Sequence, residues 1–287
     1  MSDIAVIGLG KMGTALAETL LKSGQSVTVW NRSDGQGESL VDLGARFAPS
    51  LKTAIASSAV IITCVRDHAT TTALLSTEPD ALAGKTVLDL STGDAEEAEH
   101  LVTFLTSAGA QWQIGMINAY PSGIGSEKTA ILCGGPLTVW KRCEDIIKLL
   151  GGASAHVGTT PAAVPGLFAA MFTARQGFMF GLIFGGAVCR KAGLSMQVFA
   201  DQIPVTLGVA SSYADLFMHT VPDKKYDDPA ATVQVYLNAL EDVMATFDET
   251  GTNDALPRLM RDLTRRAVDQ GLGDKELTAL VELLAKD

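Results

Sequence analysis

The first 160 residues alternate between short apolar runs and helix-like patterns of apolar positions. Runs rich in Val, Ile and Leu predict buried strands at residues 4–8, 27–30, 60–64 and 86–90, and further strands are expected near 111–115, 129–133 and 155–157. Apolar positions three or four residues apart predict helices at residues 11–23, 37–43, 51–56, 70–75, 94–107 and 136–150. This alternation is typical of an α/β fold with a parallel, doubly wound sheet.

After residue 160 the chain shows helical periodicity only. We expect helices at residues 161–192, 195–203, 206–218, 230–249, 255–270 and 275–286, and no further strands. The chain therefore divides into a first domain of residues 1–160 and an all-α C-terminal domain of residues 161–287. The second domain begins with a long interdomain helix.

The start of that helix is unusually apolar. Arg175 is the only charged residue between positions 161 and 189, and this stretch is long enough to span a bilayer. A charge near the middle of a membrane span is costly, however, and the rest of the chain is acidic and soluble in character. We therefore expect a long buried helix and no membrane partner.

Composition narrows the function classes. The 287 residues carry a formal net charge of −10, which argues against a nucleic-acid partner, because such a partner needs clustered Lys and Arg. The four cysteines form no CxxC pair and the four histidines show no metal-ligand spacing, so neither a metal site nor a disulfide framework is expected. The N-terminus lacks the features of a signal peptide, which indicates a cytoplasmic protein.

A glycine motif lies between the first predicted strand and the first predicted helix. Gly8-Leu9-Gly10-Lys11-Met12-Gly13 is a GxGxxG sequence in the place where a dinucleotide site requires it. The first glycine allows the tight turn, the second lets the backbone approach a pyrophosphate, and the third lets the helix pack on the strand. The pyrophosphate would lie at the helix N-terminus. The motif predicts a Rossmann-type cofactor domain.

The end of the second strand selects the cofactor. An NAD site carries Asp or Glu there, which accepts a hydrogen bond from the ribose 2′-hydroxyl, whereas this chain has Asn31-Arg32-Ser33. A carboxylate would repel a 2′-phosphate, while an Arg fork and a Ser hydroxyl can bind it. We therefore predict NADP(H). The loop Val65-Arg66-Asp67 follows another strand at the carboxyl edge of the sheet, with His68 next to it, and we expect this loop to contact the cofactor.

With these residues in hand, the chain resembles the imine reductases and reductive aminases, a group within the 3-hydroxyacid dehydrogenase superfamily. The resemblance covers essentially the whole length. It is carried by GLGKMG at 8–13, WNRS at 30–33, DLSTG at 89–93, IGSE at 124–127 with AIL at 130–132, PGL at 165–167, KYDDPA at 225–230 and LE at 240–241.

The resemblance implies a function and an assembly. It implies NADPH-dependent reduction of a C=N bond in an imine or iminium substrate, with Ser91 and Thr92 beside the nicotinamide. It also implies an intertwined homodimer, in which each active site lies between the cofactor domain of one subunit and the helical domain of the other.

The expected catalytic positions depart from the pattern of the family. Relatives that oxidise hydroxyacids carry a lysine on the interdomain helix, and imine reductases usually carry Asp or Tyr, but the corresponding residue here is Phe172. Reductive aminases often add a Tyr two turns further on, where this chain has Phe180. Neither phenyl ring has a proton to give, whereas an alkoxide needs a proton partner at neutral pH. We therefore expect a preformed or basic iminium substrate, with Tyr120 as another candidate proton donor.

Three readings of function stay open from the sequence. The first is an imine or iminium reductase acting on a bulky or aromatic substrate, in keeping with a role in secondary metabolism. The second is an NADP-dependent hydroxyacid or aldehyde reductase of the same superfamily, which the missing lysine disfavours. The third is a non-catalytic sensor that binds NADPH. The aromatic face near Phe172 is interpreted either as a substrate pocket or as helix-packing core.

Overall fold

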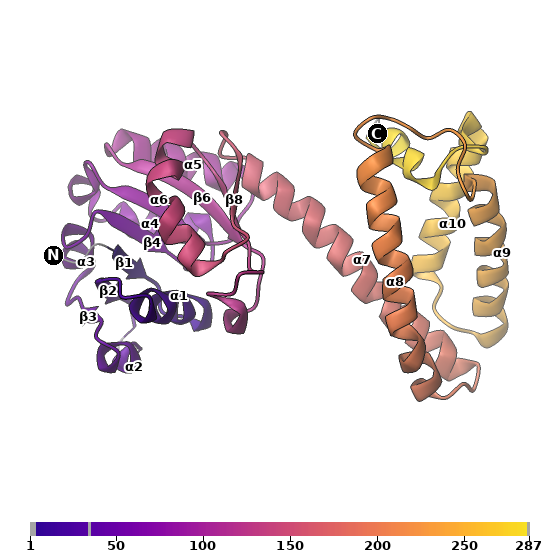
Figure 1. Ribbon diagram of the computed structural model, residues 1–287, viewed down its shortest axis with the longest axis horizontal. Helices are drawn as coiled ribbons and strands as arrows, with labels where there is room; N and C mark the ends of the chain where they lie inside the picture. Colours follow the sequence, from indigo (N-terminus) through magenta and orange to yellow (C-terminus); the bar gives the residue numbers. More distant parts are fainter. Residues whose placement is uncertain (1–3, 34–35, 286–287) are drawn as a thin grey trace. The chain divides into compact units, whose positions relative to one another are not determined.

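A computed structural model describes residues 4–33 and 36–285, and it separates the chain into two compact units, Met1–Phe172 and Thr173–Asp287 (Figure 1). Residue 286, the expected end of the last helix, lies outside the described residues. The two units are described in turn.

The first unit contains one eight-stranded sheet. Its strands are β1 (Ile4–Ile7), β2 (Val27–Trp30), β3 (Arg46–Phe47), β4 (Val60–Thr63), β5 (Thr86–Asp89), β6 (Gln111–Ile117), β7 (Ile131–Gly134) and β8 (Ala155–Gly158). They are arranged in the order β3-β2-β1-β4-β5-β6-β7-β8. The first six places follow the strand order of the dinucleotide-binding fold, so the chain direction reverses between β1 and β4 and leaves a crevice at their carboxyl ends. The predicted α/β class is confirmed.

Helices cover both faces of this sheet. They are α1 (Lys11–Lys22), α2 (Glu38–Asp42), α3 (Leu51–Ala56), α4 (His68–Leu75), α5 (Ala95–Ser107) and α6 (Leu137–Leu150), with short 3₁₀ turns at Pro79–Leu82 and Pro121–Gly123. Alternate residues of β1 enter different cores. Val6 packs with Leu16 of α1 on one face, and Ile7 packs with Leu101 of α5 on the other. All four residues of β1 are fully buried, which explains their continuous apolar run.

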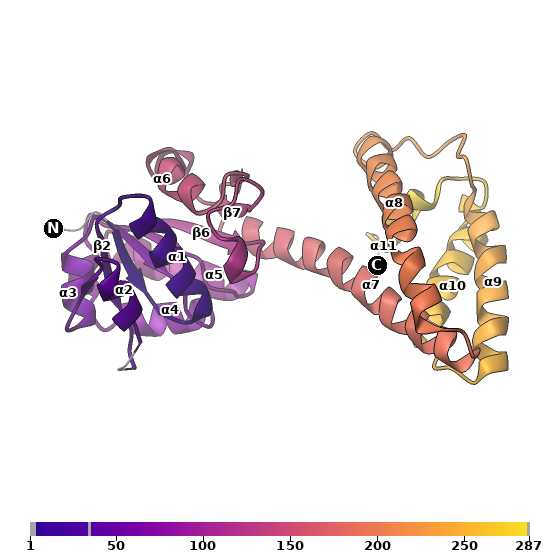
Figure 2. The same cartoon turned by 60° about the horizontal axis from the view of Figure 1, so that its bottom comes forward.

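The second unit is helical. It contains most of α7 (Ala163–Lys191) together with α8 (Met196–Thr220), α9 (Val233–Thr250), α10 (Ala255–Ala267) and α11 (Leu280–Leu284), a π-helical turn at Val268–Leu272 and a 3₁₀ turn at Leu277–Ala279. Helices α9 and α10 lie side by side (Figures 1 and 2). The predicted all-α character of this region is confirmed.

Three expectations differ from the structure. Strand β7 runs antiparallel to β6, so the sheet is mixed rather than fully parallel. The helices expected at 195–203 and 206–218 form one continuous helix, α8, with Pro204 inside it. A proline within a helix removes one backbone hydrogen bond, and the helix continues across this loss. The two-residue strand β3 was not predicted, because it is too short to show a pattern.

The apolar helix α7 is not buried by its own chain. Among its residues only Val164 and Pro165 are buried. By length and composition α7 is the one described helix that is able to cross a membrane, and none of its most apolar 18-residue window is buried. The described residues of this one chain therefore do not supply the burial that the sequence led us to expect for α7.

Candidate functional site

The glycine motif forms the turn between β1 and α1. Gly8 has a φ of +95°, and a Cβ there would lie 2.4 Å from the carbonyl oxygen of Cys64. A Cβ on Gly13 would lie 1.9 Å from the carbonyl oxygen of Gly8. Both positions therefore require glycine, for the tight turn and for the close packing of helix on strand.

The N-terminus of α1 is open to a ligand. A Cβ on Gly10 would meet no atom within 4 Å, and no side chain caps the first turn of α1, which begins at Lys11. The first backbone N–H groups of a helix have no partner within the helix and favour an anion. This end of α1, with Leu9 and Met12 beside it, fits the pyrophosphate of a dinucleotide.

Beside this turn lies a polar pocket with two guanidinium groups, which we call the arginine pocket. Asn31 shapes it, because its Oδ1 accepts a hydrogen bond from the Leu9 N–H at 3.0 Å and its Nδ2 donates to the Ser33 carbonyl at 3.1 Å. The pocket is lined by Gly8, Trp30, Asn31, Arg32, Ser33, Val65, Arg66, Thr70 and Leu74. This lining contains no carboxylate, so its charges fit a phosphate group.

Asp67 has a structural partner at the start of α4. Its Oδ1 accepts a hydrogen bond from the Thr70 N–H at 2.7 Å, and its Oδ2 accepts from Arg66 Nε at 2.6 Å. The hydrogen bond from the Thr70 hydroxyl is the main reason that the pKa of Asp67 is lowered to about 2. Asp67 caps α4 and does not line the arginine pocket, whereas its neighbours Val65 and Arg66 both line it.

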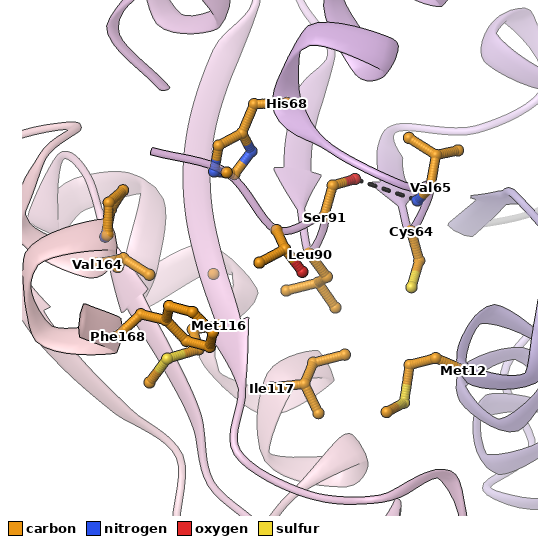
Figure 3. Close-up of a pocket in the computed structure, with 14 residues that line it drawn as sticks. Met12, Cys64, Val65, His68, Leu90, Ser91, Met116, Ile117, Val164 and Phe168 are labelled. Atoms are coloured by element: carbon orange, nitrogen blue, oxygen red, sulfur yellow. Dashed lines mark hydrogen bonds between the residues drawn. The ribbon is translucent and has the colours of Figure 1, made fainter. Parts of the chain in front are cut away.

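A second cavity, which we call the main pocket, lies next to the first. Val65 lines both, so the two meet at the reversal point between β1 and β4. Figure 3 shows His68, Val164 and Phe168 along the wall of the main pocket, with Met12 on another side. It is lined by Met12, Cys64, Val65, His68, Leu90, Ser91, Thr92, Gly93, Gly115, Met116, Ile117, Val164, Pro165 and Phe168.

A buried polar network supports this wall. Asp89, at the end of β5, is fully buried, and its Oδ1 accepts hydrogen bonds from Thr63 Oγ1 at 2.6 Å, Ser91 Oγ at 2.7 Å and Thr71 Oγ1 at 3.0 Å. Its Oδ2 lies 2.5 Å from His68 Nδ1. In turn, the Val65 N–H donates to Ser91 Oγ at 3.1 Å (Figure 3). The network thus joins the loop after β4, which lines both pockets, to the loop after β5, which lines the main pocket.

Sequence reasoning missed the role of Asp89 and His68. It placed His68 at the correct edge of the sheet but assigned it no partner, because the pairing depends on the register of two strands. Thr63 of β4 pairs with Asp89 of β5 in the sheet, and this register brings both residues beside the start of α4. A histidine after an N-cap aspartate, together with an aspartate at the end of a buried strand, was the available signal.

The three expected catalytic residues, Phe172, Tyr120 and Phe180, do not lie together at one pocket. Phe172 stacks on Phe168, with ring centroids 5.2 Å apart, and Phe168 lines the main pocket. Tyr120 is 74% exposed and Phe180 is 52% exposed, and neither lines the main pocket or the arginine pocket. Cys64 lines the main pocket, but burial is the main reason that its pKa is raised to about 12, so its thiol stays protonated.

Comparison with known proteins assigns the family. Residues 3–158 match the NAD binding domain of 6-phosphogluconate dehydrogenase, and residues 166–286 match the C-terminal domain of the NADPH-dependent reductive aminase-like proteins. The NADPH-dependent reductive aminase of Aspergillus oryzae is 26% identical, over 97% of this chain and 96% of its own.

Solved structures agree along the whole chain. The imine reductase of Myxococcus stipitatus in complex with NADP⁺ is 28% identical with a TM-score of 0.92, over 98% of this chain and 99% of its own. The reductive aminase of Aspergillus terreus in complex with NADPH and ethyl levulinate is 29% identical with a TM-score of 0.90, over 99% of both chains. The chain belongs to the imine reductase and reductive aminase family.

Membership of this family of NADPH-dependent oxidoreductases confirms two predictions. The resemblance drawn from the GLGKMG and WNRS motifs is confirmed by the matches over both parts of the chain. The prediction of NADP(H) from Asn31-Arg32-Ser33 is also confirmed. The open helix end at α1 and the carboxylate-free arginine pocket are the features of this chain that fit that cofactor.

Proposed function

We propose that the protein reduces the C=N bond of an iminium ion to an amine, with NADPH as the hydride donor. The observation that supports this proposal is the stacking of Phe172 on Phe168, a residue of the main pocket. We assign Phe172, on the resemblance given above, to the helix position where relatives carry a proton-transferring side chain. Hydride addition to a neutral imine leaves nitrogen in need of a proton. Hydride addition to an iminium carbon gives the neutral amine without one.

The chain's own residues hold the cofactor at the two pockets. We assign the 2′-phosphate to Arg32, Ser33 and Arg66 in the arginine pocket and the pyrophosphate to the turn from Gly8 to Gly13. Ser91 and Thr92 then lie at the nicotinamide end, in the main pocket. Asp67 acts on this site through the α4 cap that orients Arg66.

The substrate side of the site is apolar and aromatic. Phe168, Met116 and Ile117 line the main pocket, and the Phe172 ring extends the stack begun by Phe168. Aromatic faces attract cations through their ring quadrupoles. This lining suits a bulky or aromatic iminium, and it supports a role in secondary metabolism. An alcohol substrate would need a base in place of Phe172, so a hydroxyacid reductase is disfavoured.

We further propose that two chains pair through the helical domain of residues 161–287, next to the cofactor domain of residues 1–160. Val205 and Val209 of α8 are 64% and 67% exposed, and Ile183 of α7 is 62% exposed. Large apolar side chains that are exposed on neighbouring turns of one helix, as Val205 and Val209 are, support an association surface. Arg175, near the middle of α7, favours a second chain over a bilayer as the partner, consistent with a cytoplasmic enzyme. Phe180 and Tyr120 would then contribute to the paired site.

NADPH consumption against three substrates tests the function. The panel contains a cyclic imine, an N-alkylated iminium salt, and a hydroxyacid in the reverse direction with NADP⁺. We expect consumption with the iminium salt at a rate that does not vary with pH from neutral to alkaline conditions. Turnover of the hydroxyacid alone would contradict the proposal, and tight NADPH binding without any turnover would favour a sensor.

A further inference from the structure

We propose that His68 accepts a hydrogen bond from the N–H group of the substrate. The site would then select iminium ions that carry an N–H group. The inference rests on the proposed reduction of iminium ions and narrows its substrate class. It is carried by the juxtaposition of His68, buried Asp89 and the main pocket.

The proton on the imidazole is fixed by Asp89. Three side-chain hydroxyls and the Ser91 N–H all donate to Asp89 Oδ1, so this carboxylate acts as an acceptor, and its Oδ2 is left for His68. Nδ1 of His68 therefore donates to Oδ2, at 2.5 Å. In the neutral ring the proton then resides on Nδ1, and Nε2 is an acceptor.

The acceptor nitrogen opens on the main pocket. His68 lines this cavity, and its side chain is only 2% exposed. No described residue bonds to Nε2, and this nitrogen is not among the polar atoms that the fold seals from solvent. The small exposed part of the ring therefore includes Nε2. A substrate N–H group reaching this wall of the pocket finds an acceptor with a fixed direction (Figure 3).

The position of the ring is set on its other edge by Gly93. A Cβ at Gly93 would lie 2.3 Å from His68 Cδ2, and the His68 N–H donates to the Thr92 carbonyl at 3.1 Å. The loop after β5 thus holds both the backbone and the ring of His68. Rotation of the ring away from the pocket would also break the bond to Asp89.

The charges around the ring favour a cation. Asp89 lies on β5. Glu97 lies on α5, and its Oε2 is buried without a hydrogen-bond partner among the described residues, 2.7 Å from the position that a Cβ at Gly93 would take. The Cys64 thiol, directly after β4, is held neutral by burial, and Arg66 is paired with Asp67. The carboxyl groups of Asp89 and Glu97 thus lie behind this wall, and carboxyl groups attract an iminium ion more strongly than a neutral imine or a ketone.

The test compares two substrates with the same ring, a cyclic imine protonated on nitrogen and its N-methyl iminium salt, on the full-length enzyme. In His68→Asn the amide retains a donor for Asp89 but has no atom at the Nε2 position. In His68→Gln the amide oxygen reaches the Nε2 position. His100, an exposed histidine on α5, provides the matched control His100→Asn.

We expect His68→Asn to lower the ratio of kcat/KM for the N–H substrate over the N-methyl substrate by about tenfold or more, the size of one hydrogen bond to a charged group. His68→Gln should lower this ratio less, and His100→Asn should leave it as in the wild type. An unchanged ratio in His68→Asn, or an equal loss on both substrates, would overturn the proposal. If the wild type reduces neither substrate, the proposed function itself fails and the assignment of His68 fails with it.

A second experiment uses the wild-type enzyme only and therefore does not depend on whether a variant folds. The cyclic secondary ammonium ion and its N,N-dimethyl quaternary analogue are compared as competitive inhibitors of the wild-type enzyme in the presence of NADPH. We expect the quaternary ion to bind about tenfold more weakly, because it has no N–H group to donate. Equal inhibition by the two ions would overturn the proposal even where reduction of iminium ions is established.

Discussion

The two compact units bury their apolar side chains in different ways. In the first unit, the residues of β1 are fully buried and core clusters fill both faces of the sheet. In the second, the buried cluster consists of Val233, Ala267 and Leu283, while many large apolar side chains on α8 are exposed. The first unit completes its own core and contains both pockets to which we assign the cofactor. The second presents the exposed apolar surface through which we propose that two chains pair.

The largest effect is expected where the first unit is packed most closely. Gly13→Val places a side chain where a Cβ alone would lie 1.9 Å from the Gly8 carbonyl oxygen. We expect the free energy of unfolding to fall by about 3 kcal/mol, measured by denaturant titration, because α1 must move away from β1.

Gly10→Ala is the matched control for that substitution. Its Cβ meets no protein atom within 4 Å, so stability should stay within about 0.5 kcal/mol of the wild type. NADPH affinity should still fall, because the Cβ occupies the space through which the pyrophosphate approaches the backbone. Equal loss of stability in both variants would contradict this account of the turn.

The exposed face of α8 provides the next largest effect. Val209→Glu should raise the dissociation constant of the dimer on the order of 100-fold, because a symmetric pair loses two buried apolar contacts and gains two charges. Analytical ultracentrifugation measures this change. NADPH binding to the first unit should persist in the resulting monomer, whereas turnover should be lost. Gln202→Glu, also exposed on α8, adds the same charge without removing an apolar side chain, and a similar dissociation there would argue against an apolar interface.

Removal of a guanidinium from the arginine pocket should affect cofactor choice more than stability. We expect Arg32→Ala to weaken NADPH binding by about 10- to 100-fold, the range for a hydrogen bond to a charged group, with a much smaller effect on NADH. Fluorescence titration with both cofactors gives the ratio. Arg46→Ala, an exposed arginine on β3 that lines neither pocket, is the control and should leave the ratio unchanged.

The smallest effect concerns the cap of α4. Asp67→Ala should lower stability at neutral pH by about 1 kcal/mol, the usual contribution of an N-cap. Because the folded-state pKa of Asp67 is lowered to about 2, its contribution is present above the ordinary pKa and is lost as the pH falls from about 4 to 2. Unfolding experiments along this pH range should show that the free energies of unfolding of the wild type and of Asp67→Ala converge. Asp67→Asn retains the cap and should stay close to the wild type at neutral pH.

Sequence patterns predicted the bounds of those elements of the first unit that follow from their own residues. The apolar runs gave strands β1, β2 and β4 to within one residue, because buried parallel strands have no polar face to interrupt them. The direction of β7 was beyond such reasoning, since a four-residue strand carries no signal of its orientation. Helix α8 across Pro204 was likewise unpredictable from proline statistics.

The candidate site shows the same division. The glycine turn and Asn31-Arg32-Ser33 are each a continuous stretch of sequence. Their chemistry could therefore be predicted without a structure. The contact between His68 and Asp89 joins residues from separate elements, and it depends on the register of β4 with β5. The exposure of Tyr120 and Phe180 likewise depends on tertiary packing, and their catalytic roles stay predictions.

The central claim is that Phe172 leaves the site without a protein acid. The most direct test measures kcat/KM of Phe172→Asp with NADPH on a neutral imine and on an N-alkylated iminium salt. We predict that the ratio of kcat/KM for the neutral imine over the iminium salt rises at least tenfold, because the new carboxyl group supplies the missing proton. An unchanged ratio, with a wild type already active on the neutral imine, would contradict the account and show that another group donates the proton.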